Sequence, residues 1–163
     1  MSNDRLSPGD ILTEANNMLC QDNEAMLFVT VWLGIITVST GELVSANGGH
    51  EYPAIYRSGE GFTLEEDNHG LALGIMEDVD YEETRWVLAK GDGVFVYTDG
   101  IPEATNAENE FFGTKRMVDA LNHYAGCSSE EILNGIHREV GEFVGEAPQF
   151  DDVTMLALMY RGK

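Results

Sequence analysis

The sequence predicts an α+β fold in which antiparallel β-sheets are covered by helices. Three observations support this class. One amphipathic helical pattern opens the chain, several short apolar segments separated by turns follow it, and two more helical patterns precede a last apolar segment. Because most strands come together rather than alternating with helices, an α+β arrangement is favoured over a parallel sheet. The 163 residues suffice for one domain with a substantial core.

The charge of the chain limits its partners. Acidic residues number 29 and basic residues 9, so the formal net charge is −20. Such a surface repels nucleic acid phosphates and anionic lipids, and we expect neither nucleic acid nor a membrane as a partner. A hydrophobic content of 43% is typical of a folded domain rather than a disordered chain. The amino terminus lacks the basic and apolar regions of a signal peptide, so a cytoplasmic location is expected.

The first predicted helix starts near Ser7, which suits the N-cap, and Pro8, which suits the first helical position. Apolar residues then share one face of this helix: Ile11, Leu12, Ala15, Met18 and Leu19. Residues 26–38 form a long apolar run rich in β-branched and aromatic side chains. This composition predicts a strand that is buried on both faces.

Shorter strands are predicted in the middle of the chain, at residues 43–46, 53–56, 84–89 and 93–98. A turn at Thr40-Gly41 lets the first of them return antiparallel to the preceding strand. Residues 59–68 are polar and predict a loop. Lys90-Gly91-Asp92 is a good turn sequence, so the last two strands are expected to form a hairpin.

Two helices and a strand are predicted toward the carboxyl terminus. Residues 117–124 carry apolar side chains on one helical face, and Gly126 ends this helix. The next helix opens with a capping box from Ser128 to Glu131. The last strand covers residues 153–160, which are mostly apolar.

Carboxylates at the ends of two apolar strands form the candidate site. Asp99 follows the strand 93–98, and Asp151 and Asp152 precede the strand 153–160. If these strands are antiparallel neighbours, their carboxylates converge at one sheet edge and imply a cation, with oxygen ligands favouring Mg²⁺ or Mn²⁺. On the pattern alone a simpler interpretation is favoured, in which Asp99 is a turn residue and Asp151 a loop cap.

Seven short motifs occur in order along the chain. Tyr97-Thr98-Asp99-Gly100, with Glu103-Ala104 close behind, resembles the Y-T-D-G-x-x-E-A signature of bacterial PPM-type serine/threonine phosphatases. The resemblance is to the branch that contains the stage II sporulation and sigma-B regulatory phosphatases. Asp151-Asp152-Val153-Thr154 is similar to the closing D-D-x-T of that family. The other five are Phe28-Val29-Thr30, Ala46-Asn47-Gly48-Gly49-His50, Leu73-Gly74-Ile75, Lys90-Gly91-Asp92 and Phe112-Gly113.

The resemblance implies an α-β-β-α sandwich of antiparallel sheets and a pair of Mn²⁺ or Mg²⁺ ions at one sheet edge, where activated water attacks phosphorus. It assigns Asp99 and Asp151 as metal ligands. Asp152 is a further candidate ligand, or a residue at the start of the strand that bonds to backbone. His50 is a candidate catalytic residue that orients substrate or water, or else it only completes a tight loop. Gly48 replaces the alanine that the family has here, which is expected to matter little.

The family domain normally begins with more chain. Its early G-G-D-x-x-D-like and G-D-x-x-G segments supply further aspartates and have no counterpart here. Residues 1–163 are therefore expected to be a single but incomplete phosphatase domain that lacks the amino-terminal strands. Three explanations stay open: the chain is a fragment of a longer phosphatase, it is a member that has lost catalysis, or a second chain supplies the strands. An exposed sheet edge would favour a homodimer.

The resemblance implies a metal-dependent serine/threonine protein phosphatase. Its substrate would be a small phosphorylated regulatory protein of the anti-sigma-factor antagonist type. The alternatives are a catalytically inactive protein-interaction module with the same fold and a generic acidic cation-binding domain. Substituting Asp99 and Asp151 separates them, because only an enzyme would lose turnover while staying folded.

Overall fold

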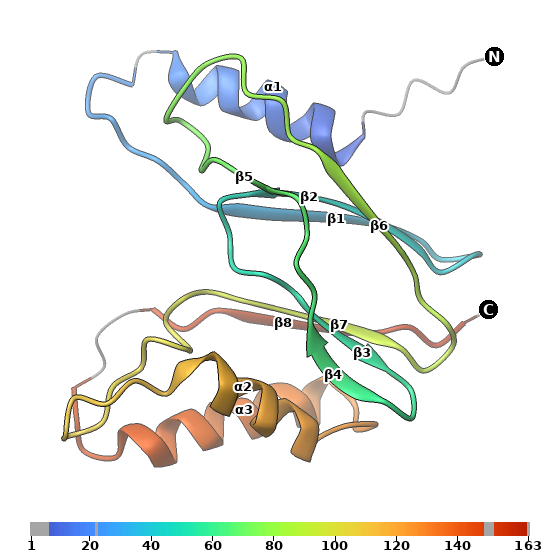
Figure 1. The fold of residues 1–163 in the computed structure, drawn as a ribbon, viewed down its shortest axis with the longest axis vertical. Coiled ribbons are helices and arrows are strands. Elements are labelled where there is room, and N and C mark those ends of the chain that lie inside the picture. Colours follow the sequence, from blue (N-terminus) through green and yellow to red (C-terminus); the bar gives the residue numbers. More distant parts are fainter. Residues whose placement is uncertain (1–6, 22, 149–151, 163) are drawn as a thin grey trace. The chain divides into compact units, whose positions relative to one another are not determined.

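A computed structural model describes residues 7–21, 23–148 and 152–162 (Figure 1). These residues contain three helices and eight strands, and the strands form two four-stranded sheets. The chain divides into two compact units, Met1–His50 with Glu66–Val87 and Glu51–Glu65 with Leu88–Lys163. The α+β class is confirmed, and both sheets are antiparallel except for one short pairing. Among the described residues, no helix combines the length and apolar character needed to span a bilayer.

The first unit consists of one sheet with a helix on one of its faces (Figure 1). Strand β2 is central: it pairs antiparallel with β1 and β6 and, over two residues, parallel with β5. Buried Leu12 of the helix packs with Ala46 of β2 and with Leu73 and Tyr81. The elements are α1 (Pro8–Cys20), β1 (Val31–Thr37), β2 (Glu42–Gly48), β5 (His69–Gly70) and β6 (Glu83–Val87).

Helix α1 begins as predicted. The Ser7 hydroxyl accepts a hydrogen bond from the Asp10 N–H, and the Asp10 carboxylate accepts one from the Ser7 N–H, which makes a capping box. Asn16 is fully buried and joins the helix to a distant segment: its side chain accepts from the Gly74 N–H at 2.9 Å and donates to the Met76 carbonyl at 2.8 Å.

The prediction for residues 26–38 is only partly right. A strand forms, but it begins at Val31, because Met26 adopts a positive φ of 51° and the Asn23 side chain accepts a hydrogen bond from the Leu27 N–H. The strand is not buried on both faces, since Ile35 is 42% exposed. The strand also lies at an edge of the sheet: β1 pairs with β2 on one side, and no other strand among the described residues pairs with its second side.

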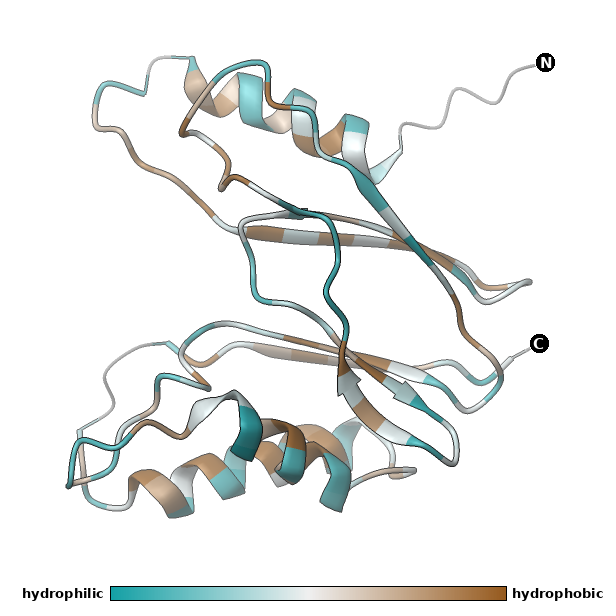
Figure 2. Cartoon of the chain, viewed as in Figure 1, coloured by the Kyte–Doolittle hydropathy of each residue, from teal (hydrophilic) through white to brown (hydrophobic). Residues whose placement is uncertain are grey.

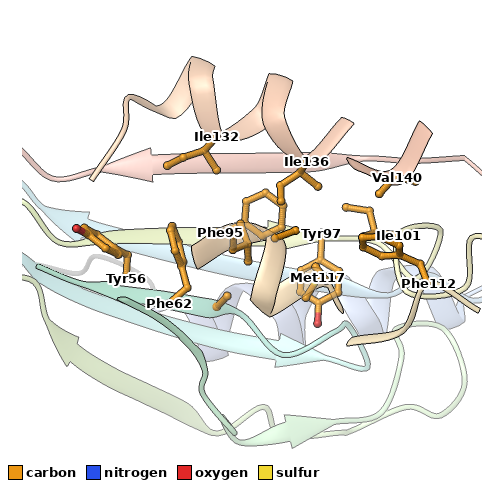
Figure 3. Packing of buried hydrophobic residues seen from close by; sticks show 13 residues of the cluster. Tyr56, Phe62, Phe95, Tyr97, Ile101, Phe112, Met117, Ile132, Ile136 and Val140 are labelled. Atoms are coloured by element: carbon orange, nitrogen blue, oxygen red, sulfur yellow. The ribbon is translucent and has the colours of Figure 1, made fainter. Parts of the chain in front are cut away.

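The second unit has an antiparallel sheet in the order β4-β3-β7-β8, with two helices on one face (Figure 1). Ile132, Ile136 and Val140 of α3 point toward the aromatic side chains of the sheet, including Phe95 and Tyr97 (Figure 3). Figure 2 shows that β7 and β8 consist largely of apolar residues. The elements are β3 (Ala54–Arg57), β4 (Gly61–Leu64), β7 (Gly93–Tyr97), α2 (Gly113–His123), α3 (Ser129–Val144) and β8 (Met155–Met159).

The caps of the two helices agree with the predictions. Ser128 and Glu131 form the predicted capping box of α3, with the Glu131 N–H donating to the Ser128 hydroxyl. Gly126 lies just beyond α2 with a φ of 81°, a conformation that suits glycine.

Residues 59–68 are not the loop that their polarity predicted, because they contain strand β4. The outer edge of this strand is held by a side chain of α2. The Asn122 side chain accepts from the Phe62 N–H at 2.8 Å and donates to the Phe62 carbonyl at 3.0 Å. A helix amide therefore takes the place that a fifth strand would occupy at Phe62.

The hairpin predicted for residues 84–98 is wrong. Strand β6 pairs with β2 in the first unit, whereas β7 pairs with β3 and β8 in the second. The turn itself forms, with the Asp92 N–H donating to the Ala89 carbonyl at 2.9 Å. Its aspartate also accepts hydrogen bonds from Arg57 and Ser58, which fixes the turn beside the end of β3 rather than between two paired strands.

Candidate functional site

The candidate site lies where β7 ends and β8 begins. The two strands are antiparallel neighbours, as the sequence predicted, and Tyr97 lies opposite Met155 in their register. The pairing continues past the strand ends, since the Thr98 N–H donates to the Thr154 carbonyl at 3.0 Å. The chain at Asp99 therefore lies at the same sheet edge as the chain at Asp152.

Two small residues hold this edge together. The Thr98 hydroxyl donates to the Asp152 carbonyl at 3.1 Å and accepts from the Thr154 N–H at 3.1 Å. Gly100 lies so close that a Cβ there would come within 2.4 Å of the Asp152 carbonyl oxygen. Thr98 and Gly100 thus position the backbones that carry the two aspartates. Their part was not predicted, although both belong to the motif that includes Asp99.

Asp99 is exposed at this edge. Its backbone carbonyl accepts from the Glu103 N–H at 2.9 Å, so Asp99 is a turn residue, as the simpler interpretation held. No hydrogen bond or ion pair to its carboxylate is found in the described part of the chain. The carboxylate is therefore available to a ligand from solution.

Of the other two predicted ligands, Asp151 and Asp152, the structure describes Asp152 alone. Asp152 is exposed beside Gly100 and takes part in another interaction of its own. Asp151 lies outside the described residues, so its convergence with Asp99 stays a prediction. Among residues 7–21, 23–148 and 152–162, no three or more His, Cys, Asp or Glu side chains are grouped so that they could hold a metal. The donors that are present are carboxylate oxygens, which suit Mg²⁺ or Mn²⁺.

A cleft opens beside the same edge in the second unit. Its volume is about 230 Å³, and it is reached from Gly100 and Val153, which are sequence neighbours of the two aspartates. The wall is mostly apolar, with Glu103 and His137 as its titratable side chains. The lining residues are Gly100, Glu103, Ala104, Thr105, His137, Val140, Gly141, Val144, Pro148 and Val153.

His50 lies in the first unit, directly after the loop that follows β2. The Asn47 side chain accepts from the His50 N–H at 2.8 Å and donates to the His50 carbonyl at 3.0 Å. The ring is placed by Thr30, whose hydroxyl lies 3.2 Å from His50 Nδ1. His50 does complete a tight loop, and its action on substrate or water stays a prediction.

Comparison with known proteins agrees with the fold. The chain has the architecture of a PP2C-like phosphatase domain. Residues 1–161 match the model of the stage II sporulation protein E (SpoIIE) family, and the chain belongs to that family.

Two curated relatives are similar over 94% of this chain. Protein IcfG of Synechocystis sp. is 31% identical over 154 residues, which are 23% of its length. The phosphoserine phosphatase RsbU of Bacillus subtilis is 26% identical over 154 residues, which are 45% of its length. The chain therefore spans less than half the length of either relative.

Solved structures share the fold. The SiaA PP2C domain of Pseudomonas aeruginosa has a TM-score of 0.78 and 24% identity, over 95% of this chain and 61% of that one. The phosphatase domain of SpoIIE from Bacillus subtilis, in a Mn-presoaked form, has a TM-score of 0.68 and 19% identity, over 94% of this chain and 66% of that one.

Proposed function

We propose that residues 1–163 form part of one metal-dependent serine/threonine protein phosphatase domain, with Asp99, Asp151 and Asp152 as ligands of a divalent cation. The observation that carries this proposal is the edge of β7 and β8, where the exposed Asp99 directly precedes Gly100, whose backbone lies against the Asp152 carbonyl. Membership of a phosphatase family supports the reaction class. Carboxylate donors support Mn²⁺ or Mg²⁺ as the ion, and a Mn-presoaked form is known for a relative's domain.

A cation is also what the charge of the chain requires. With a net charge of −20, the protein repels a phosphate ester unless positive charge is supplied at the site. When bound, a divalent ion would activate water for attack on phosphorus and neutralise charge developing on the phosphoryl oxygens. Thr98 and Gly100 hold the two aspartate backbones in register, and we assign His50 the orienting of substrate or water.

The substrate class that we propose is a phosphoserine or phosphothreonine on a small regulatory protein of the anti-sigma-factor antagonist type. The likeness to the phosphoserine phosphatase RsbU supports this class. The apolar cleft beside Gly100 supports it too, because a cleft of about 230 Å³ suits side chains that flank a phosphorylated residue. A small inorganic phosphate would make no use of such a wall.

The first test is the binding of Mn²⁺, measured by titration calorimetry on this chain. Asp99→Asn is expected to weaken binding at least about tenfold, because it removes a charged oxygen ligand. Asp80→Asn is the matched control, since it neutralises an exposed aspartate of the first unit and should leave the affinity unchanged. Hydrolysis of a phosphoserine peptide should fall with the affinity.

Two outcomes would contradict the proposal. Equal weakening by both substitutions would indicate a generic acidic cation-binding domain. Binding that depends on Asp99 without any hydrolysis of the peptide, in this chain and in a longer one, would indicate an inactive interaction module.

We also propose that the chain forms a homodimer. Strands β1 and β8 each pair on one side only among the described residues, and neither contains a charged residue or proline that would protect its free edge. Light scattering at high concentration is therefore expected to give a mass above the 17.9 kDa of one chain. A constant mass of one chain at all concentrations would contradict this prediction.

A further inference from the structure

A buried carboxylate of the first unit lies outside the proposed metal edge. Asp67 is 8% exposed, and each of its oxygens accepts one hydrogen bond. Trp32 Nε1 donates to Oδ2 at 3.0 Å, and Asn47 Nδ2 donates to Oδ1 at 2.9 Å. Burial raises the pKa of Asp67, and the hydrogen bonds from Asn47 and Trp32, together with nearby His69, act in the opposite direction. The carboxylate is thus held in place by two donors that come from neighbouring strands.

The sheet brings these donors to one face. Trp32 of β1 lies directly opposite Asn47 of β2, and the residues that alternate with them, such as Leu33 and Ala46, pack in the cluster under α1. Trp32 and Asn47 therefore project from the face away from α1. Gly34 makes room for the indole ring, because a Cβ there would lie 2.6 Å from it. The indole is fixed along β1 with its N–H directed at Asp67.

Asn47 connects Asp67 to His50 through hydrogen bonds. Its oxygen accepts from the His50 N–H, and its nitrogen donates both to the His50 carbonyl and to Asp67. The amide cannot turn over, because its NH₂ group would then face the His50 N–H. The loop is also held from the other side, where a Cβ on Gly49 would come within 2.7 Å of the Ala72 nitrogen.

We propose that Asp67 is a positioning residue, which acts through Asn47 to fix the His50 loop, the backbone from which the His50 imidazole projects. The importance of this positioning for catalysis rests on the role given to His50 in the proposed function. In this arrangement the Asp67 carboxylate holds the side-chain amide of Asn47 at the end of β2. The Asn47 amide in turn holds both the N–H and the carbonyl of His50.

Asparagine at position 67 would break this arrangement while keeping its shape. An asparagine has one acceptor oxygen, so it cannot serve both the Trp32 and the Asn47 donors. One of them is left without a partner in a buried place, and the unflippable Asn47 amide cannot adapt. The hold on the His50 loop is then weakened, because the Trp32–Asp67–Asn47 network behind it is broken, although the side-chain volume at position 67 is unchanged.

The test uses nuclear magnetic resonance on the full chain. Loss of one buried hydrogen bond corresponds to roughly tenfold in an opening equilibrium, so Asp67→Asn is expected to speed amide hydrogen exchange at His50 about tenfold. The imidazole resonances of His50 should shift, while those of His123 and His137, on α2 and α3 of the second unit, stay in place. Trp32→Phe removes one donor and should change the same signals less.

The control is Asp92→Asn, which alters an aspartate that is also buried but is tied to a turn of the second unit. It should lower stability and leave the His50 signals unchanged. The proposal is overturned if Asp67→Asn lowers stability as the control does and leaves the exchange and resonances of His50 unaltered. Should Asp67→Asn fail to fold, unchanged His50 signals in Trp32→Phe overturn it. Because no turnover is measured, this result is independent of the phosphatase assay.

Discussion

Replacing Asp92 with alanine is expected to lower the free energy of unfolding by about 3 kcal/mol, near the lower end for breaking a buried ion pair. Asp92 is 4% exposed, and its Oδ2 accepts from Arg57 Nη1 at 2.8 Å and from the Ala89 N–H at 3.0 Å. Its Oδ1 accepts from the Ser58 N–H at 2.9 Å. The substitution leaves three donors without their acceptor. Urea unfolding at neutral pH measures the loss.

The effect of Asp92 should depend on pH in a defined direction. Burial alone would raise the pKa of Asp92, but the hydrogen bonds from Ser58, Arg57 and Ala89 together lower it. The folded pKa thus lies below the unfolded value of about 3.9, so the carboxylate stabilises the fold above that pH and this stabilisation is lost as the pH falls through the folded pKa.

The difference in stability between wild type and Asp92→Ala should therefore be constant above about pH 5 and shrink in more acidic solution. Asp92→Asn keeps the volume and removes the charge, so it should show the same pH dependence with a smaller loss. A difference that stays constant down to the acid transition would contradict the role of this carboxylate.

Gly100→Ala is expected to destabilise the chain by about 2–3 kcal/mol, because the added Cβ meets backbone rather than a flexible side chain. The new atom would lie 2.4 Å from the Asp152 carbonyl oxygen, so the start of β8 must move away from the end of β7. Since that edge carries Asp99, Mn²⁺ binding should weaken as well. Thermal unfolding and calorimetry measure the two effects.

The control for this substitution is Gly141→Ala in α3. A Cβ at position 141 meets nothing within 4 Å, so the change should be neutral or stabilising through helix propensity. If Gly100→Ala proves as harmless as Gly141→Ala, then the two strand ends are not packed as closely as the fold requires.

Helix ends could be predicted from the sequence because the interactions that define them are local. The caps at Ser7 and Ser128 involve partners three residues away, and both formed as expected. Strand partners could not be predicted in the same way. The hairpin expected around Asp92 is wrong because β6 pairs with β2, whereas β7 pairs with β3 and β8, and these partners lie far away in the sequence.

The candidate site shows the same division. Asp99 and Asp152 were predicted because strand ends and short motifs mark them, and the pairing of β7 with β8 brings their backbones together. Asp67 was missed because it lies at the end of a polar segment, with partners 35 and 20 positions away. Because these partners are far apart in the sequence, their hydrogen-bond network could not be predicted before the sheet that brings them together was known.

Gly48 illustrates a further limit of motifs. Its replacement of alanine was expected to matter little for the resemblance, and the chain does belong to the family. A Cβ at this position would lie 2.3 Å from Leu73 Cδ1, the end of a flexible side chain, and 3.2 Å from the Tyr81 ring, so these two neighbours would have to shift to admit an alanine. A motif describes one segment at a time and carries no information about side chains from elsewhere that fill the space.

The Asn122 amide on β4 has a consequence for how copies of the chain can associate. It occupies both outward polar groups of Phe62, so the sheet of the second unit is closed to strand addition at that end and open only at β8. Growth of a filament through this sheet would need two open ends on it. With β8 as its one open end among the described residues, the sheet of the second unit can pair with one further copy only, in an isologous pair.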